Sequence, residues 1–428
     1  MSLRIEREKR ALLISPERCA AGWATEIVQV CLSAMAVSNR INLFSFSGSW
    51  KPSMIIRFLG LACIGLQFGL MAVGQESIVS EEHRELVPHR LLSLVHAAEV
   101  QQELKLSRQQ IVDLEACFGR LDGAWLQSRN LSPAERMSEL DRLEAELLTW
   151  ARSNWTPGQL ARLKQLELQA LSSRMFLRSD IAKELGLTDD QIDGFATLAR
   201  TTDSLQRQLQ ELAAKNQSTS DAEKAATEAM QAEIDAVGSQ LTVAQRQMLA
   251  ERVGSLFDLT QLKRIYPMAP EFADDCQWFN ASPLTLRSLR GQVVIVHFYA
   301  FQCHNCHANF EIYRRWHQQW SDQGVVVIGI QSPETKRERD PEAVRQAAVE
   351  RQLSFPIVLD LEMKNWTAWA NTMWPTVYVI DKRGYIRFWW QGELNWQGAT
   401  GDQTVEEVVE AVLAEASPVA EPRSAVER

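Results

Sequence analysis

The chain has 428 residues, of which 46% are apolar, and a formal net charge of −9. That length is sufficient for two or more domains with buried cores, so we expect a multidomain protein. The negative charge gives no basic footprint for nucleic acid, and we exclude a nucleic-acid partner.

Near the N-terminus, an apolar run over 58–73 follows the basic residues Lys51 and Arg57. Small residues at 72–74 occupy the positions that a signal peptidase reads. The run is shorter than the ~20 residues that a membrane-spanning helix needs. We therefore expect 54–74 to be a signal peptide.

The residues before Met54, 1–53, are expected to be a non-native leader from a wrongly chosen start codon, or a disordered extension. Export would place the mature protein in the periplasm or cell envelope, where disulfides persist. There Cys117 and Cys276 can pair only if their α-carbons approach within ~7 Å, which leaves that pairing open. Membrane contact is expected only through the signal or an uncleaved anchor.

Residues 81–262 are rich in Leu, Gln, Glu, Ala and Arg, with apolar residues at helical spacing, which predicts an all-α antiparallel helical domain. Four phrases recur in it: Leu106–Gln110, Trp155–Gln159, Leu187–Gln191 and Leu241–Gln245. The first and third are 188 − 107 = 81 residues apart, and the second and fourth are 242 − 156 = 86 apart. The spacing indicates a duplicated helical unit.

Each phrase also has the pattern of a helix start, because Ser or Thr followed three residues later by Gln or Glu forms a capping box. Ser132 to Glu135 is a further example. Four ordinary helix starts are therefore one interpretation. The other is that the region resembles the LTxxQ repeats of periplasmic Spy and CpxP-like proteins, which implies binding of unfolded chains or sensing of envelope stress. We favour structural helices or a partner-docking module over a chaperone.

Further along, the apolar strand Val293–Val296 continues through His297 into Cys303-His304-Asn305-Cys306, and a helix with one apolar face follows. Two cysteines at this spacing, where a buried strand turns into a helix, can open and close a disulfide. The helix N-terminus can hold the attacking sulfur as a thiolate.

More elements of a central mixed sheet flanked by helices are expected after this helix. They are strands at 325–330, 355–360, 377–380 and 385–390, and helices at 341–352 and 404–413. The tail, 417–428, is expected to be disordered.

Several ordered motifs make 268–416 resemble a thioredoxin-fold domain of the TlpA-like and redoxin class, closest to the C-terminal domain of DipZ-type proteins. They are Ala269-Pro270-Glu271-Phe272, Trp278-Phe279-Asn280, Pro283-Leu284-Thr285-Leu286, Leu289-Arg290-Gly291, the CxxC, Ile330-Gln331-Ser332-Pro333-Glu334, Trp374-Pro375 and Gly392-Glu393. The resemblance implies that Cys303 is the exposed nucleophile and Cys306 the resolving thiol of a reversible disulfide. It also implies that Pro375 is a cis-proline lying against that disulfide.

The chemistry expected of such a pair is thiol:disulfide exchange with the thiols or disulfides of protein partners. The Cys303 thiolate attacks a partner disulfide, and Cys306 then releases the reduced partner; the reverse sequence oxidises it. Neither the direction nor the upstream redox partner follows from the sequence. No cofactor is expected.

Four more residues are expected at this site. His304 either stabilises the thiolate as an imidazolium or points into solvent. His297 lies where thioredoxin-like proteins often keep a proton-transferring acid, and is either a relay or an ordinary core residue. Trp374 and Thr376, on either side of the proline, are expected to line the substrate groove.

Two metal-based alternatives compete for the same cysteines. C-x-x-C-H, with His307, is also the attachment signature of c-type haem. The core strand before it and Trp374-Pro375 after it argue against haem, because a haem would fill the groove. Zinc ligands drawn from Cys303 to His307 would lie too close in sequence for an unstrained tetrahedron, so no metal is expected.

Two further alternatives need no metal. A peroxidase of the peroxiredoxin type usually has a threonine three residues before its cysteine, and Ala300 stands there instead. The chain could also be a non-catalytic envelope binding protein, whose helical domain holds clients and whose disulfide is structural or idle.

Overall fold

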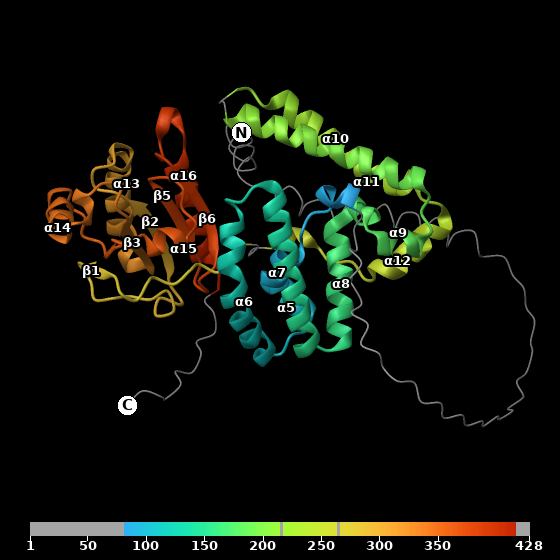
Figure 1. Cartoon of the computed structure of the whole chain (residues 1–428), viewed down its shortest axis with the longest axis horizontal. Helices are drawn as coiled ribbons and strands as arrows, with labels where there is room; N and C mark the ends of the chain where they lie inside the picture. Colours follow the sequence, from blue (N-terminus) through green and yellow to red (C-terminus); the bar gives the residue numbers. More distant parts are fainter. Residues whose placement is uncertain (1–80, 215–216, 263–265, 417–428) are drawn as a thin grey trace, which may run out of the picture. The chain divides into compact units, whose positions relative to one another are not determined.

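The computed structural model describes residues 81–214, 217–262 and 266–416 (Figure 1). The expected signal peptide, leader and C-terminal tail all lie outside these ranges. Within them, no helix is both long enough and apolar enough to cross a membrane.

The described residues form two compact units, and the helical region is divided between them. One unit combines 89–167 with 260–416, and the other combines 81–88 with 168–259. The first helices therefore belong to the same unit as the sheet, a division that the change in composition near residue 262 does not indicate.

The helical elements follow one another with short connections. They are η2 Glu81–Leu86, α4 Leu91–His96, α5 Ala98–Glu103, α6 Arg108–Ser128, α7 Pro133–Asn154, α8 Pro157–Leu171, η3 Ser172–Leu177, α9 Ser179–Leu185, α10 Asp189–Ala214, α11 Ser220–Gln240, α12 Val243–Val253 and η4 Leu259–Gln261.

The four recurring phrases are helix starts, as predicted. In the first, Ser107 Oγ accepts from the backbone N–H of Gln110, and the Gln110 side chain accepts from the N–H of Ser107. The same reciprocal bonds begin α8, α10 and α12. Each box pairs two of the backbone donors that a helix start leaves without an intrahelical acceptor.

The phrases also meet in pairs, which the sequence does not reveal. The side-chain amides of Gln110 and Gln159 exchange hydrogen bonds of 3.0 and 3.1 Å in one unit. Gln191 and Gln245 exchange bonds of 3.0 and 3.1 Å in the other. Each unit therefore contains one such glutamine pair, and the duplication expected from the spacing stays a prediction.

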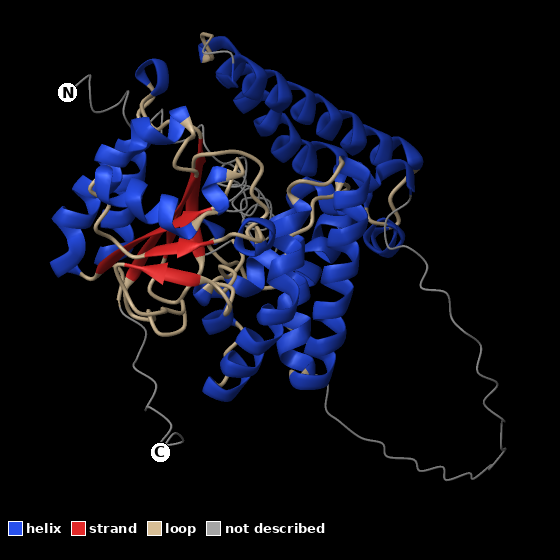
Figure 2. Ribbon diagram, turned by 60° about the vertical axis from the view of Figure 1, so that its left-hand side comes forward, coloured by secondary structure: helices blue, strands red, loops and turns tan. Residues whose placement is uncertain are grey.

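The C-terminal region contains a six-stranded mixed sheet bordered by helices (Figure 2), as predicted. Its order is β1-β4-β3-β2-β5-β6, and β2 pairs in parallel with β3 and β3 with β4, while the other pairs are antiparallel. The strands are β1 Gln277–Phe279, β2 Val293–Tyr299, β3 Val325–Gln331, β4 Ile357–Leu359, β5 Thr376–Ile380 and β6 Ile386–Gln391.

The helices of this region are α13 His304–Trp320, α14 Pro341–Glu350, α15 Lys364–Ala368 and α16 Gly401–Ala414, with short 3-10 turns η5 Ser321–Gln323, η6 Arg337–Arg339 and η7 Trp396–Gly398. The short elements β1 and α15 were not predicted, because three to five residues carry too little periodicity to stand out from a loop.

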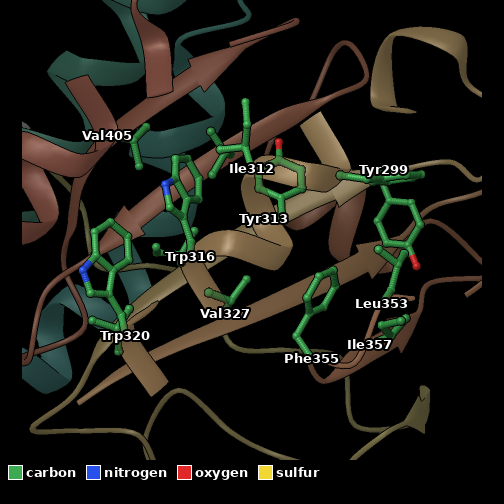
Figure 3. Packing of buried hydrophobic residues seen from close by; sticks show 14 of the residues in the cluster. Tyr299, Ile312, Tyr313, Trp316, Trp320, Val327, Leu353, Phe355, Ile357 and Val405 are labelled. Atoms are coloured by element: carbon green, nitrogen blue, oxygen red, sulfur yellow. The ribbon is translucent and has the colours of Figure 1, made fainter. Parts of the chain in front are cut away.

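The two faces of the sheet support separate cores. On one face, α13 packs Tyr313, Trp316 and Trp320 near Val327 of β3 and Phe355 (Figure 3). On the other face, the core includes Leu126 of α6 together with residues of the sheet and its loops, such as Phe298, Trp369 and Tyr378. The first helical hairpin is therefore part of the apolar packing of the α/β domain.

Candidate active site

Strand β2 delivers the two cysteines to the start of a helix. All seven of its residues are buried, and the turn after Tyr299 leads to Cys303, the N-cap residue of α13. The first N–H groups of a helix have no intrahelical acceptor and carry partial positive charge, which favours an anion there. Cys303 is partly exposed and Cys306 is buried; both are free thiols.

The two thiols have opposite pKa shifts. The pKa of Cys303 lies below its ordinary value, chiefly because the Cys306 thiol donates a hydrogen bond to its sulfur, helped by the backbone N–H groups of Cys306 and Asn305. Burial of Cys303 and the charge of Glu334 act in the opposite direction. Burial, followed by the hydrogen bond with Cys303, raises the pKa of Cys306. Of the two thiols, the one at the surface is therefore the first to ionise, and the one in the core keeps its proton.

A proline loop lies near the pair. The Trp374–Pro375 peptide bond is cis. The Trp374 indole donates to the carbonyl of Ser332 at 3.1 Å and stacks on Trp366 with ring centroids 4.0 Å apart. β5 pairs antiparallel with β2, with Thr376 opposite Phe298, so the proline loop before β5 and the turn from β2 into α13 lie at the same end of the sheet.

Comparisons with known proteins agree with this geometry. Residues 266–389 match the family model described as the AhpC/TSA family. Protein DipZ of Mycobacterium tuberculosis (strain CDC 1551 / Oshkosh) is 36% identical over 154 residues, which are 35% of this chain and 21% of DipZ. The thiol-disulfide oxidoreductase YkuV of Bacillus subtilis (strain 168) is 26% identical over 154 residues, which are 36% of this chain and 99% of YkuV.

The C-terminal region of this chain is a thioredoxin-like domain of the AhpC/TSA type. A solved structure of a thiol-disulfide isomerase from Corynebacterium glutamicum is also similar, with 24% identity, a TM-score of 0.30, and coverage of 35% of this chain and 98% of that one. The chain spans only about a fifth, 21%, of the length of the DipZ proteins. Because the family match lies in 266–389, the LTxxQ resemblance of the helical region stays a prediction.

His297 lies inside the thioredoxin-like domain with its ring stacked on that of Tyr313, the centroids 3.9 Å apart. Among the described residues, neither ring nitrogen has a hydrogen-bond partner, and burial lowers the pKa of His297 to about 3. The imidazole is therefore neutral near pH 7. Its role as a proton relay stays a prediction, and the packing suits the core interpretation equally well.

The other two histidines of the motif differ in their surroundings. His304, the first residue of α13, is exposed, which fits the solvent-facing interpretation. The Nε2 atom of His307 lies 2.6 Å from the carbonyl oxygen of Phe301, and its Nδ1 atom lies 3.4 Å from Arg351. A haem iron would have to displace one of these contacts. Within the described ranges, no group of three or more His, Cys, Asp or Glu side chains is arranged to hold a metal ion.

The two residues expected to line the groove also differ. Trp374 is partly exposed and can present an indole face to a substrate. Thr376 is buried, and its hydroxyl donates to the carbonyl of Met373 at 2.8 Å. Its side chain thus holds the turn around Pro375, and a substrate contact of Thr376 stays a prediction.

Sequence reasoning missed Glu338, the most unusual carboxylate near the site. It is completely buried, and its oxygens accept from the backbone N–H groups of Gln302 at 2.6 Å, Glu334 at 2.8 Å and Thr335 at 2.7 Å. Glu338 therefore ties the residue next to Cys303 to the loop after β3. It stands in the charged run Lys336–Asp340, which by itself is typical of a solvated surface.

Two tyrosines near the resolving thiol were also missed as site residues. Burial raises the pKa of Tyr299 and of Tyr313, and the charge of a Cys306 thiolate adds to the rise in both. Their phenols therefore stay protonated and lie within electrostatic range of that sulfur. In the sequence, both tyrosines stand in apolar patterns that are typical of ordinary core residues.

The other two cysteines of the described ranges do not form a disulfide. Cys117 and Cys276 both carry free thiols, and burial raises the pKa of each. Cys117 lies in the core around α6, whereas the sulfur of Cys276 accepts from the Asn365 side chain at 3.4 Å. Neither shares the thiolate-stabilising position of Cys303.

Proposed function

We propose that this protein is an extracytoplasmic thiol:disulfide oxidoreductase that exchanges disulfides with protein partners through Cys303 and Cys306. The observation that carries the proposal is the placement of the two thiols, with Cys303 partly exposed at the N-cap of α13 and Cys306 buried within that helix. Their opposed pKa shifts are consistent with it. The names of the relatives, among them a thiol-disulfide oxidoreductase, point to the same chemistry.

In the proposed exchange, each disulfide bond that forms replaces one that breaks, in two steps. The Cys303 thiolate attacks one sulfur of the partner disulfide, forming a mixed disulfide and releasing the other partner sulfur as a thiolate. Cys306 then loses its proton and attacks the sulfur of Cys303, which frees the second partner thiolate. The partner gains two electrons, and the Cys303/Cys306 pair is left as a disulfide; an external dithiol regenerates it.

Reduction of insulin by the purified protein, with dithiothreitol as the regenerating dithiol, tests this activity. Cys303→Ser should abolish turnover above the dithiothreitol background, whereas Cys276→Ser should leave it unchanged because the Cys276 sulfur contacts Asn365 and burial raises its pKa. Equal turnover by wild type and Cys303→Ser would contradict the oxidoreductase and favour a binding protein. Peroxide consumption that depends on Cys303 without insulin reduction would favour the peroxidase instead.

The extracytoplasmic location is proposed from the pattern of 54–74, an apolar run ended by small residues. Expression of the full chain with a C-terminal tag tests it. We expect to recover the protein in the envelope fraction, with an N-terminus close to residue 75 after removal of the signal peptide. Recovery of unprocessed chain from the cytoplasmic fraction alone would contradict the location and leave the thiol chemistry untouched.

A further inference from the structure

We propose that Arg129, at the C-terminal end of α6, positions the loop that leads into the cis-proline and thereby sets how well the domain takes up protein disulfides. The proposal rests on the oxidoreductase function proposed above and adds a residue from the helical region to it. Arg129 is a positioning residue, because it acts through the loop and not on the reacting sulfurs.

The guanidinium of Arg129 binds the backbone that precedes the proline loop. Its Nη2 atom donates to the carbonyl oxygens of Trp369 at 2.7 Å and Ala370 at 2.9 Å, and it lies 2.5 Å from the hydroxyl of Tyr378. The neighbouring Asn130 side chain donates to the same Ala370 carbonyl at 2.8 Å. Two consecutive residues of the α6–α7 turn therefore hold two consecutive carbonyls.

The loop segment that these bonds hold has a conformation that requires support. Ala370 has φ +51°, in the left-handed region that a residue with a Cβ rarely adopts. The N–H of Asn371 donates to the carbonyl oxygen of Trp366, within α15, at 3.1 Å, so the segment is tied from both sides. Trp374 and Pro375 follow within five residues of Ala370, and a shift of the segment moves the groove wall.

Helix α6 contacts the thioredoxin-like domain at a second place, far from Pro375. Glu115 of α6 pairs with Arg383 at 2.6 Å, in the turn after β5. Pro375 stands at the opposite end of β5, and five extended residues span roughly 17 Å. Glu115 and Arg129 are also about 21 Å apart along a helix of this length. Loss of either contact weakens the packing of α6, but of Glu115 and Arg129 only Arg129 touches the segment before Pro375.

The pKa values of the two thiols are set by other elements of the fold, which Arg129 does not contact. Cys303 and Cys306 lie at the junction of β2 and α13, and the hydrogen bonds that set their pKa values come from within that junction. A change at Arg129 is therefore expected to alter uptake of a protein disulfide while leaving the reactivity of the thiolate unchanged.

The test compares Arg129→Lys, Asn130→Ala and the control Glu115→Ala in the full chain. For each, kcat and KM for insulin, the rate with the small disulfide DTNB, and the reduction potential of the pair are measured. Arg129→Lys should raise KM about fivefold to tenfold, since two charge-assisted bonds to backbone carbonyls are lost or weakened. Asn130→Ala should raise it less. Both should leave kcat, the DTNB rate and the potential at wild-type values.

Glu115→Ala should leave KM unchanged even where it lowers the melting temperature as much as Arg129→Lys does. A wild-type KM in Arg129→Lys would overturn the inference, and so would an equal rise of KM in Glu115→Ala or a shifted potential in Arg129→Lys. Absence of turnover in the wild type is a different failure: it would overturn the oxidoreductase itself, and the inference with it.

Discussion

The buried thiol of Cys306 donates a hydrogen bond to the sulfur of Cys303, and this contact is the largest cause of the lowered pKa of Cys303. The donor sits in the core and the acceptor at the surface, so the first thiol to ionise is the one that a partner can reach. The burial of the pair thus favours the order of the two exchange steps that we propose.

Cys306→Ala should raise the pKa of Cys303 toward its ordinary value, because the substitution removes that donor. The rate of alkylation by iodoacetamide, followed by mass spectrometry against pH, measures this pKa. In the reduced wild type, Cys303 should react with an apparent pKa below that of a free thiol, while Cys306 stays unmodified in the folded protein. Superimposable pH profiles for wild type and variant would contradict the role of the hydrogen bond.

His297 makes the domain sensitive to acid. Its pKa is lowered to about 3 in the folded state and is near 6.5 when the chain unfolds, so between these values the unfolded state binds the extra proton. The stabilisation is complete above pH 6.5 and is lost as the pH falls, by at most about 1.4 kcal/mol per pH unit. His297→Phe should flatten this dependence in urea unfolding between pH 7 and 4, and an unchanged slope would be evidence against a neutral buried imidazole.

The same variant separates the two interpretations of His297. If the imidazole is a proton relay, His297→Phe should slow insulin reduction while the pKa of Cys303 stays where it is. If it is a core residue, turnover at pH 7 should remain close to that of the wild type. The two results exclude one another, and the alkylation profile shows whether the nucleophile itself was disturbed.

Glu338→Gln should lower both the stability of the protein and its rate of insulin reduction, although Glu338 stands in a run of exposed charged residues. An amide cannot accept three backbone N–H groups with its single oxygen, so the loop after β3 loses part of its tie to Gln302. We expect a loss of about 2 kcal/mol of stability, the size of a hydrogen bond to a buried charge, together with slower insulin reduction.

The matched control for Glu338 is Asp381→Asn. Asp381 is also a buried carboxylate that accepts two backbone N–H groups, from Arg383 and Tyr385, but it lies in the turn at the far end of β5. Both substitutions should lower the free energy of unfolding, and Glu338→Gln alone should slow turnover. Comparable loss of activity in both variants would show that Glu338 contributes to stability alone and has no specific role at the site.

The paired glutamines of the helical region should be energetically coupled. In a double-mutant cycle, Gln191→Ala and Gln245→Ala together should cost less than the sum of the single substitutions, with a coupling energy of about 1 kcal/mol. Chemical denaturation monitored by circular dichroism supplies the four free energies. Additive losses would show that the amide pair stabilises nothing beyond the two separate helix starts.

The sequence was informative where the cause of a structure is local. The capping boxes lie within four residues, and the CxxC stands directly between a strand and its helix, so both were predicted. Features that depend on distant residues were not: the exchange between Gln110 and Gln159, the burial of Glu338 inside a charged run, and the clamp of Arg129 on Ala370.

The grouping of α6 with the sheet shows the same limit. Leu126 belongs by composition and periodicity to the helical region, yet it packs among residues of the thioredoxin-like domain, more than a hundred positions away. Amphipathic spacing reveals that a helix has an apolar face but not which partner covers it.

Trapping of a mixed disulfide tests the central claim most directly. Cys306→Ser is incubated with insulin, and the products are separated without reductant and analysed by mass spectrometry. We predict a covalent adduct joined through Cys303, because the variant keeps the nucleophile and lacks the thiol that resolves the intermediate. Cys303→Ser, run in parallel, should give none. An adduct through Cys276 in Cys306→Ser, an adduct through Cys306 in Cys303→Ser, or no adduct with Cys306→Ser would contradict the assignment of the two thiols.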